Sequence, residues 1–266
     1  MEEIKRFRVL GHEIFGIIHV PDQKEKKVGV VLLCPGHQYR VGPHRMYVKL
    51  ARCLENEGYH VLRVDSEGIG DSTGGFSDEY LHEVHARIQR GKFIKSSSWI
   101  IRQYRKEYGL KKVVVSGLCG GSLTGLLVSR CCRAVDAVVG LGLPFKFIDV
   151  QDPISGPAAT NELQKKGASA PVRESLFQVY LRKTLDLDAW KRALFLRSDY
   201  RLIINALKHA FQMKVLRRNP TIIYKAIDAL FKLFDSDRPV LLIYSGNDFH
   251  YQNFQAIVEQ NAKLKE

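Results

Sequence analysis

A glycine-rich pentapeptide between an apolar run and a helical segment constrains the fold of this chain most. Residues 112–116 are rich in valine, Gly-Leu-Cys-Gly-Gly follows at 117–121, and residues 123–132 have helical spacing. Glycine tolerates strained turns and the close approach of neighbouring backbone. The pattern therefore predicts a sharp strand–turn–helix bend that lifts Cys119 out of a sheet, with glycines needed on both sides of it.

Apolar runs and helical segments alternate along the chain. Short runs rich in Val, Ile and Leu occur at residues 28–33, 60–64, 112–116, 137–141 and 240–244, and helical spacing occurs at 45–57, 96–108 and 123–132. Continuous apolar runs are typical of strands buried on both faces. This order predicts an α/β fold with a mostly parallel sheet covered by helices on both faces. Residues 7–10 and 14–20 predict an antiparallel pair at the sheet edge.

The pattern changes between residues 151 and 238. This stretch has no convincing strand, and it has helical segments at 173–181, 187–195 and 200–211. It interrupts the sheet before its last strand, where an insertion would lie over the carboxyl ends of the strands. We therefore expect a core formed by residues 1–150 and 239–266, with a helical cap insertion at 151–238.

Composition narrows the class of protein. A chain of 266 residues suits one α/β domain with an insertion better than two independent domains. Its five cysteines are odd in number and show no CxxC spacing, which argues against a disulfide framework or zinc site and favours a reduced, cytoplasmic setting. No apolar run is long enough for a transmembrane helix, and the start does not resemble a signal peptide. We expect no cofactor.

The formal net charge of +13 admits several partners. Anionic lipid, an acidic substrate, nucleic acid and plain solubility are all compatible with it. The basic residues are scattered, and no basic stripe is interleaved with aromatic residues, so we do not expect nucleic-acid binding. His82 and His85 lie three apart on a predicted helix. Because no third ligand lies nearby in the sequence, we interpret them as a solvated face and expect no metal.

The bend at Cys119 points to nucleophilic chemistry. G-x-nucleophile-x-G after a strand and before a helix is the nucleophile elbow of α/β hydrolases, with cysteine here in place of serine. The helix N-terminus would favour a thiolate and an oxyanion. The alternative is a small buried cysteine beside a dinucleotide-binding loop. That loop would have different glycine spacing and follow the first strand of the sheet, so we favour the nucleophile.

Two further stretches complete the expected site. His37 or Gln38, at the end of an early strand, would donate a backbone N–H to an oxyanion hole together with Gly120. Asp248 follows the last apolar run, where the acid of a catalytic triad should stand. The competing interpretations are an ordinary strand–helix turn for His37 and Gln38 and a surface aspartate in a turn for Asp248. The turn at residues 65–72 is interpreted as structural, with aspartates that bind local backbone N–H groups.

Several of these stretches resemble the exosortase A system-associated hydrolases, over about residues 28–258. The matching motifs are Gln38–Arg45, Leu62–Asp65, Gly68–Ser72, Gly117–Cys119, Tyr180–Lys183, Ser198–Arg201 and Ser245–Asp248. The resemblance implies a bacterial cytoplasmic α/β hydrolase associated with exopolysaccharide and protein-sorting gene clusters, without a well-defined substrate. Two positions depart from the family: His37 stands where proline is usual, and Gly120 where an acidic residue is usual.

The base histidine of such a site is not evident. In α/β hydrolases it follows the acid and one more strand, but the only histidine after Asp248 is His250, and helical residues 253–263 follow. A truncated chain, a base supplied by His37 or His250, and a degenerate, non-catalytic protein are the three explanations. We favour truncation as the hypothesis. A missing edge strand would leave unpaired backbone, through which an oligomer could complete the sheet.

The sequence thus supports two functions. The first is acyl transfer, in which Cys119 attacks the carbonyl of an ester or thioester of a small-molecule, lipid or glycan substrate. The second is a binding or scaffold role that uses the hydrolase fold without turnover, with the basic cap contacting an anionic glycan, lipid or protein.

Overall fold

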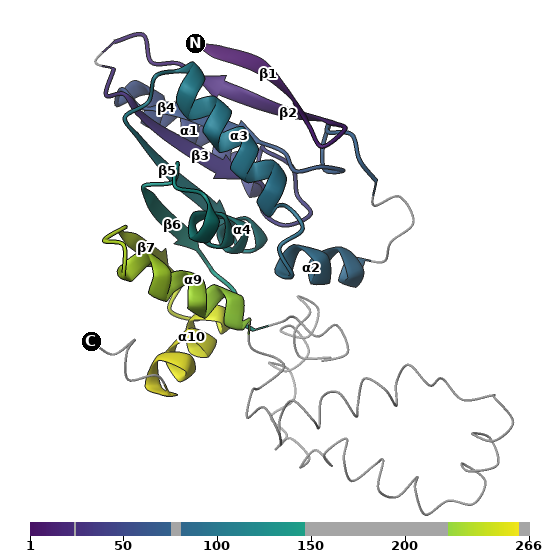
Figure 1. The fold of residues 1–266 in the computed structure, drawn as a ribbon, viewed down its shortest axis with the longest axis vertical. Coiled ribbons are helices and arrows are strands. Elements are labelled where there is room, and N and C mark those ends of the chain that lie inside the picture. Colours follow the sequence, from purple (N-terminus) through teal and green to yellow (C-terminus); the bar gives the residue numbers. More distant parts are fainter. Residues whose placement is uncertain (24, 76–80, 147–222, 261–266) are drawn as a thin grey trace, which may run out of the picture. The chain divides into compact units, whose positions relative to one another are not determined.

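A single seven-stranded sheet organises the part of the chain that the computed structural model describes, residues 1–23, 25–75, 81–146 and 223–260 (Figure 1). The strands are β1 (Glu2–Val9), β2 (His12–His19), β3 (Val28–Leu33), β4 (His60–Val64), β5 (Lys112–Leu118), β6 (Ala137–Leu141) and β7 (Val240–Ile243). Their spatial order is β1-β2-β4-β3-β5-β6-β7. β1 and β2 pair antiparallel with each other, β2 is antiparallel to β4, and β3 to β7 run parallel. The predicted mostly parallel sheet is confirmed.

Helices cover both faces of this sheet. They are η1 (Pro43–Arg45), α1 (Met46–Asn56), α2 (Leu81–Gln89), α3 (Ile94–Glu107), α4 (Gly120–Cys131), α9 (Tyr224–Phe234) and α10 (Phe249–Gln260). Successive strand residues point to opposite faces. Val30 and Leu32 of β3 therefore pack with α1, whereas Val31 and Leu33 pack in the larger core that includes α3 and α4.

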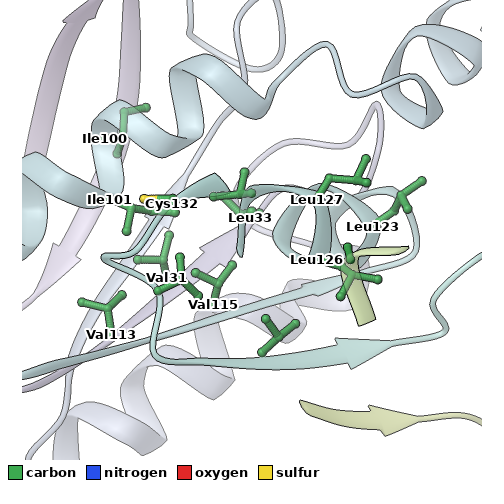
Figure 2. Packing of buried hydrophobic residues seen from close by; sticks show 14 of the residues in the cluster. Val31, Leu33, Ile100, Ile101, Val113, Val115, Leu123, Leu126, Leu127 and Cys132 are labelled. Carbon is green, nitrogen blue, oxygen red and sulfur yellow. The ribbon is translucent and has the colours of Figure 1, made fainter. Parts of the chain in front are cut away.

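The helix α4 lies at the centre of the larger core. Figure 2 shows Leu123, Leu126 and Leu127 of α4 beside β3 and β5 side chains. Every residue of α4 from Gly120 to Ser129 is buried, so the helix is enclosed on nearly all sides. Burying each such leucine contributes about 1.5–3 kcal/mol. This packing holds the first turn of α4, and with it Cys119, against the ends of β3 and β5.

The expected cap lies mostly outside the described residues, as do its three predicted helices. The last part of residues 151–238 is described, and there α9 packs on α4, with Ala226, Leu230 and Leu233 in the same core. Asp228 also forms an ion pair with Arg130 of α4, at 2.7 Å. Residues of α9 thus belong to the helical layer of the sheet. The division into core and cap remains a prediction.

Among the described strands, β7 is the last in the spatial order. Its residues are alternately half-buried and exposed, and Leu241 and Ile243 are 55% and 46% exposed.

Among the described residues no helix is both long and apolar enough to cross a lipid bilayer.

Candidate active site

The backbone at Cys119 is strained where the sequence predicts a sharp bend. Cys119 lies between β5 and α4 with φ 51° and ψ −114°. A residue with a side chain at positive φ costs about 1–3 kcal/mol, and such strain clusters at functional sites. The Cys119 N–H donates to the Leu141 carbonyl at 2.8 Å, and the Cys119 carbonyl accepts the Ser122 hydroxyl at 2.6 Å and the Leu123 N–H at 3.1 Å.

Three glycines make this turn sterically feasible. A Cβ on Gly117 would lie 2.4 Å from the Gly121 carbonyl carbon, and one on Gly121 would lie 2.5 Å from the Leu33 carbonyl oxygen. These contacts explain the two glycines that the sequence analysis requires. A Cβ on Gly120 would lie 2.8 Å from the Cα of Gly36. The third glycine therefore lets the loop after β3 approach the turn at Cys119.

The thiol of Cys119 is half-buried, and its pKa is raised above the ordinary value. Burial is the largest cause, and the Asp248 carboxylate adds to it, whereas a hydrogen bond from the Gly120 N–H lowers the pKa in part. The first N–H of the helix thus favours the thiolate as expected, but burial outweighs this backbone donor, so that the net direction of the pKa is upward.

The loop after β3 contains His37 and Gln38, the two expected backbone donors, and lies against the turn at Cys119. The Gln38 N–H already donates to the Pro35 carbonyl, at 3.2 Å. The His37 N–H has no such partner among the residues that the structure describes. His37 directly follows Gly36, which lies against Gly120. The loop thus approaches the turn at Cys119 through Gly36 and Gly120, and the Gln38 N–H is engaged in a turn within the loop.

A buried aspartate fixes this loop from a distance in the sequence. Asp65 Oδ1 accepts the backbone N–H of Arg40 at 2.7 Å, and the Arg40 guanidinium binds both Asp65 and Asp71. The Asp71 backbone N–H also donates to Asp65 Oδ2, but over a longer distance of 3.4 Å. The predicted local turn at residues 65–72 thus has its main partner in Arg40. An arginine in the Gln38–Arg45 motif and an aspartate after the next strand were the only sequence signals for this contact.

Tyr47 is a positioning residue that the sequence analysis missed. Its hydroxyl donates to the Leu33 carbonyl at 2.9 Å and accepts the Leu118 N–H at 2.7 Å. It therefore joins the ends of β3 and β5 one residue before Cys119. A tyrosine at a helical core position gives no sequence signal for such a role, because the two groups that it joins come from other elements.

Asp248 lies near Cys119, and its carboxylate is used as a helix cap. Its Oδ1 accepts the backbone N–H of His250 at 2.8 Å, at the first turn of α10. Its Oδ2 lies 3.3 Å from the Cβ position of Gly142, the residue after Leu141. The Nδ1 atom of His250 is buried and has no hydrogen-bond partner among the described residues. The structure thus brings Asp248 toward Cys119 without joining it to the His250 ring.

The histidine pair expected on a solvated helix face also differs. His85 is half-buried on α2, and its ring contacts that of His37. The solvated-face interpretation is wrong for His85, because α2 packs against the loop after β3; the side chain of His82 lies outside the described residues. In the described ranges, no three His, Cys, Asp or Glu residues gather in a way that could hold a metal ion.

The chain matches no protein-family model and no curated protein. Among solved structures it is similar to the α/β hydrolase GrgF from Penicillium sp. sh18, at 12% identity and a TM-score of 0.51 over 99% of this chain and 97% of that one. DcsB with its substrate analogue matches at 14% identity and a TM-score of 0.48, over 64% of this chain and 56% of that one.

An α/β serine hydrolase homologue from Coxiella burnetii matches at 15% identity and a TM-score of 0.41, over 59% of this chain and 66% of that one. The matched part thus spans less than two thirds of DcsB and of the Coxiella protein. The strand order, the turn at Cys119 and the full-length match to GrgF agree: this chain has the α/β-hydrolase fold.

Proposed function

We propose that this α/β-hydrolase-fold chain transfers the acyl group of an ester or thioester through Cys119. The observation that carries the proposal is the strained turn itself, a cysteine at φ 51° between β5 and α4. Such strain persists only where the surrounding structure imposes it. Here the three glycines and the buried helix α4 impose it on the one residue of the turn that has a nucleophilic side chain.

In the proposed reaction the Cys119 sulfur attacks the carbonyl carbon of the substrate. The backbone N–H groups of His37 and Gly120 bind the oxyanion that forms, and donors placed in this way often supply more of the rate enhancement than any other group. Water or an acceptor alcohol then resolves the acyl-enzyme. Asp248, whose charge acts on the thiol, is the acidic group of the site.

The substrate class follows from the resemblance in the sequence. The motifs shared with exosortase A system-associated hydrolases support an acyl substrate that is a small molecule, a lipid or a glycan, in exopolysaccharide metabolism. No nucleic-acid partner is part of the proposal, because the sequence lacks a basic stripe with interleaved aromatic residues.

A second candidate function is binding without turnover. Two observations favour it: the pKa of Cys119 is raised, and no histidine ring within the described residues hydrogen-bonds Asp248. A degenerate hydrolase fold that serves as a scaffold would have both properties.

Acylation of the full chain by an activated p-nitrophenyl ester distinguishes the two functions. We expect the acyl group on Cys119 by peptide mass spectrometry, and release of the free acid over time. Cys119→Ala should lower p-nitrophenol release by about 10³-fold or more. The matched control is Cys53→Ala, since Cys53 is an exposed thiol on α1. A folded protein acylated no faster at Cys119 than at Cys53 would leave only the binding role.

A further inference from the structure

A pocket outside the proposed acyl-transfer site lies beside the β1–β2 hairpin and α3. It encloses about 420 Å³ and is lined by residues of β1, the hairpin turn, α3 and the end of α4. In the structure α3 packs against both β1 and α4 (Figure 1). Pockets that bind small organic molecules have volumes of about 300–1,000 Å³. The size of this pocket is therefore suited to a small-molecule ligand.

One face of α3 supplies both cationic and aromatic lining. Lys95, Trp99 and Arg102 are separated by four and three residues, a spacing that places them on the same side of a helix. Trp99 is half-buried and packs against the larger core, whereas Lys95 and Arg102 are exposed. Along this face an aromatic side chain therefore lies between two cations.

The two cations on α3 have no counter-charge. Neither Lys95 nor Arg102 forms a hydrogen bond or an ion pair with another residue in the part of the chain that the structure describes. By contrast, the next cation of this helix, Arg105, is paired with Asp136 at 2.8 Å. None of the described residues that line the pocket is acidic. The pocket therefore carries an uncompensated positive charge, which favours an anion.

The hairpin turn adds an exposed apolar side chain to the same pocket. Val9 pairs with His12, so Leu10 and Gly11 form a two-residue turn, and both have positive φ, at 52° and 82°. Such turns favour asparagine, aspartate or glycine at the first position, because other side chains are strained there. Leu10 is 63% exposed, so burial within the protein does not explain a leucine at this position. Contact with a ligand in the pocket would explain it.

We propose that this pocket binds one molecule of an amphipathic anion, that is, an organic molecule with a carboxylate or phosphate group on an apolar body. The anionic group binds the Lys95 ammonium and the Arg102 guanidinium, and the apolar body packs on Trp99 and Leu10. The inference goes beyond the proposed acyl transfer and does not depend on it.

Both parts of the lining are needed for this choice of ligand. A small inorganic anion would pair with the cations but leave Trp99 and Leu10 in contact with water. A neutral apolar molecule would cover these two side chains but bring no counter-charge. Hydrophobic stabilisation grows with the apolar area that is buried, and hydrogen bonds to charged groups add to it. A molecule with both parts should therefore bind more tightly than either part alone.

The fluorescence of Trp99 tests the choice of ligand. The chain has two tryptophans, Trp99 and Trp190, so Trp190→Phe leaves the indole of the pocket as the sole reporter. Decanoate is the probe. Acetate lacks the apolar chain, and decyltrimethylammonium reverses the charge, so these two are the matched controls. Decanoate should change the fluorescence saturably, at a concentration at least about tenfold below that needed by either control. Added salt should weaken its binding.

Charge reversal separates the pocket from the general positive charge of the chain. Lys95→Glu and Arg102→Glu should each weaken decanoate binding by about tenfold or more, because a hydrogen bond to a charged group is lost. Lys106→Glu makes the same change of charge on an exposed residue of α3 outside the lining. This control should leave binding within about twofold, as expected for an exposed charge.

Leu10→Asn tests the hairpin contact without endangering the fold. Asparagine suits the positive φ of this turn, so the free energy of unfolding in urea should stay the same or rise. Decanoate binding should weaken severalfold, because the leucine contact is lost.

Cys131 provides a check that needs no variant. This exposed thiol also lines the pocket, whereas Cys53 is an exposed thiol on α1, across the sheet from α3 and α4. Decanoate should slow the alkylation of Cys131 by iodoacetamide severalfold and leave that of Cys53 unchanged, as read by peptide mass spectrometry.

Four results would overturn the proposal. Decyltrimethylammonium could bind as tightly as decanoate, Lys106→Glu could weaken binding as much as Lys95→Glu, or decanoate could fail to protect Cys131. Binding to phosphatidylglycerol vesicles without any binding of decanoate would make this face a membrane contact in place of a pocket for one molecule. None of these results bears on the acylation of Cys119, which is read at its own peptide.

Discussion

The contacts of the histidine side chains and the conformation of the backbone differ between the two ends of the parallel strands. At the amino ends, His19 and His60 are buried and hydrogen-bonded to glutamates, and the Arg63 Nε donates to His19 Nε2 at 2.9 Å. At the carboxyl ends, the backbone of Cys119 is strained, and His37 and His85 contact each other with no carboxylate partner among the described residues. His19 is thus hydrogen-bonded on both ring nitrogens and His60 on one, since the buried His60 Nδ1 has no partner among the described residues, whereas His37 and His85 contact each other through their rings.

This difference separates stability from reactivity. A buried histidine bonded on both nitrogens has its tautomer set and its proton immobilised. A strained turn with unpaired donors costs free energy and is retained where it positions reacting groups. Substitutions at the amino ends should therefore affect the free energy of unfolding alone, whereas those at the carboxyl ends should also change the chemistry of Cys119.

The largest expected effect comes from glycine substitution. The methyl group of Gly117→Ala would lie 2.4 Å from the Gly121 carbonyl carbon and 2.7 Å from the Ser122 nitrogen, which are backbone atoms that cannot yield. We expect a loss of about 3 kcal/mol or more in the free energy of unfolding, measured in urea. Gly29→Ala at the amino end meets the side chains of Leu110 and Tyr104, which can move, and should cost less.

The control for this comparison is Gly246→Ala, whose added methyl group meets nothing within 4 Å. It should change stability by about 0.5 kcal/mol at most. Equal losses for Gly117→Ala and Gly29→Ala would mean that the turn at Cys119 is no more tightly constrained than the amino end of β3.

A smaller effect is expected for His19→Leu. The substitution leaves the Arg63 Nε without its acceptor and removes one partner of Glu55, which keeps its contact with the Met1 ammonium. An unpaired buried donor costs about 1–3 kcal/mol, and more when it is charged. Urea unfolding should detect this loss. The rate of Cys119 alkylation by iodoacetamide should stay within about twofold, because His19 lies at the other end of the strands. A twofold change in rate is small beside the tenfold change that about 1.4 kcal/mol would produce. If His19→Leu changed the rate of Cys119 alkylation and left the free energy of unfolding unchanged, the amino ends would not be the part of the sheet that acts on stability alone.

The smallest effect is a pH dependence of stability shared by both ends. Burial lowers the pKa of His19, His85 and His250 in the folded chain. Below the ordinary histidine pKa of about 6.5, the unfolded chain then binds more protons than the folded one, so stability falls as the pH falls through that range. Urea midpoints measured from neutral pH downward should show this slope, and His19→Leu should reduce it. An unchanged slope would mean that His19 does not contribute.

The strands were predictable because burial on both faces leaves a local signature. Residues 28–33, 60–64 and 137–141 coincide with β3, β4 and β6. The strand at 112–116 is longer in the structure, since β5 continues to Leu118, whose backbone N–H donates to the Tyr47 hydroxyl. The helix after Cys119 begins at Gly120, three residues earlier than predicted, because its first turn is glycine-rich and lacks an apolar period.

The contacts within the site were not predictable in the same way. The hydrogen bond between Asp65 and Arg40 joins residues 25 apart, and that between Leu118 and Tyr47 joins residues 71 apart. The capping role of Asp248 has a local sequence pattern, but the same pattern is compatible with a triad acid. Only the position of the His250 ring distinguishes them.

The sequence by itself determined the order of strands and helices and the bend at Cys119, because apolar periodicity and the need for glycine are local properties of the chain. The tertiary structure alone decided the surroundings of the Cys119 thiol and the partners of the histidines that it describes. Burial and neighbouring charge come from segments that are distant in sequence, and they raise the pKa of the thiol in spite of its place at a helix N-terminus.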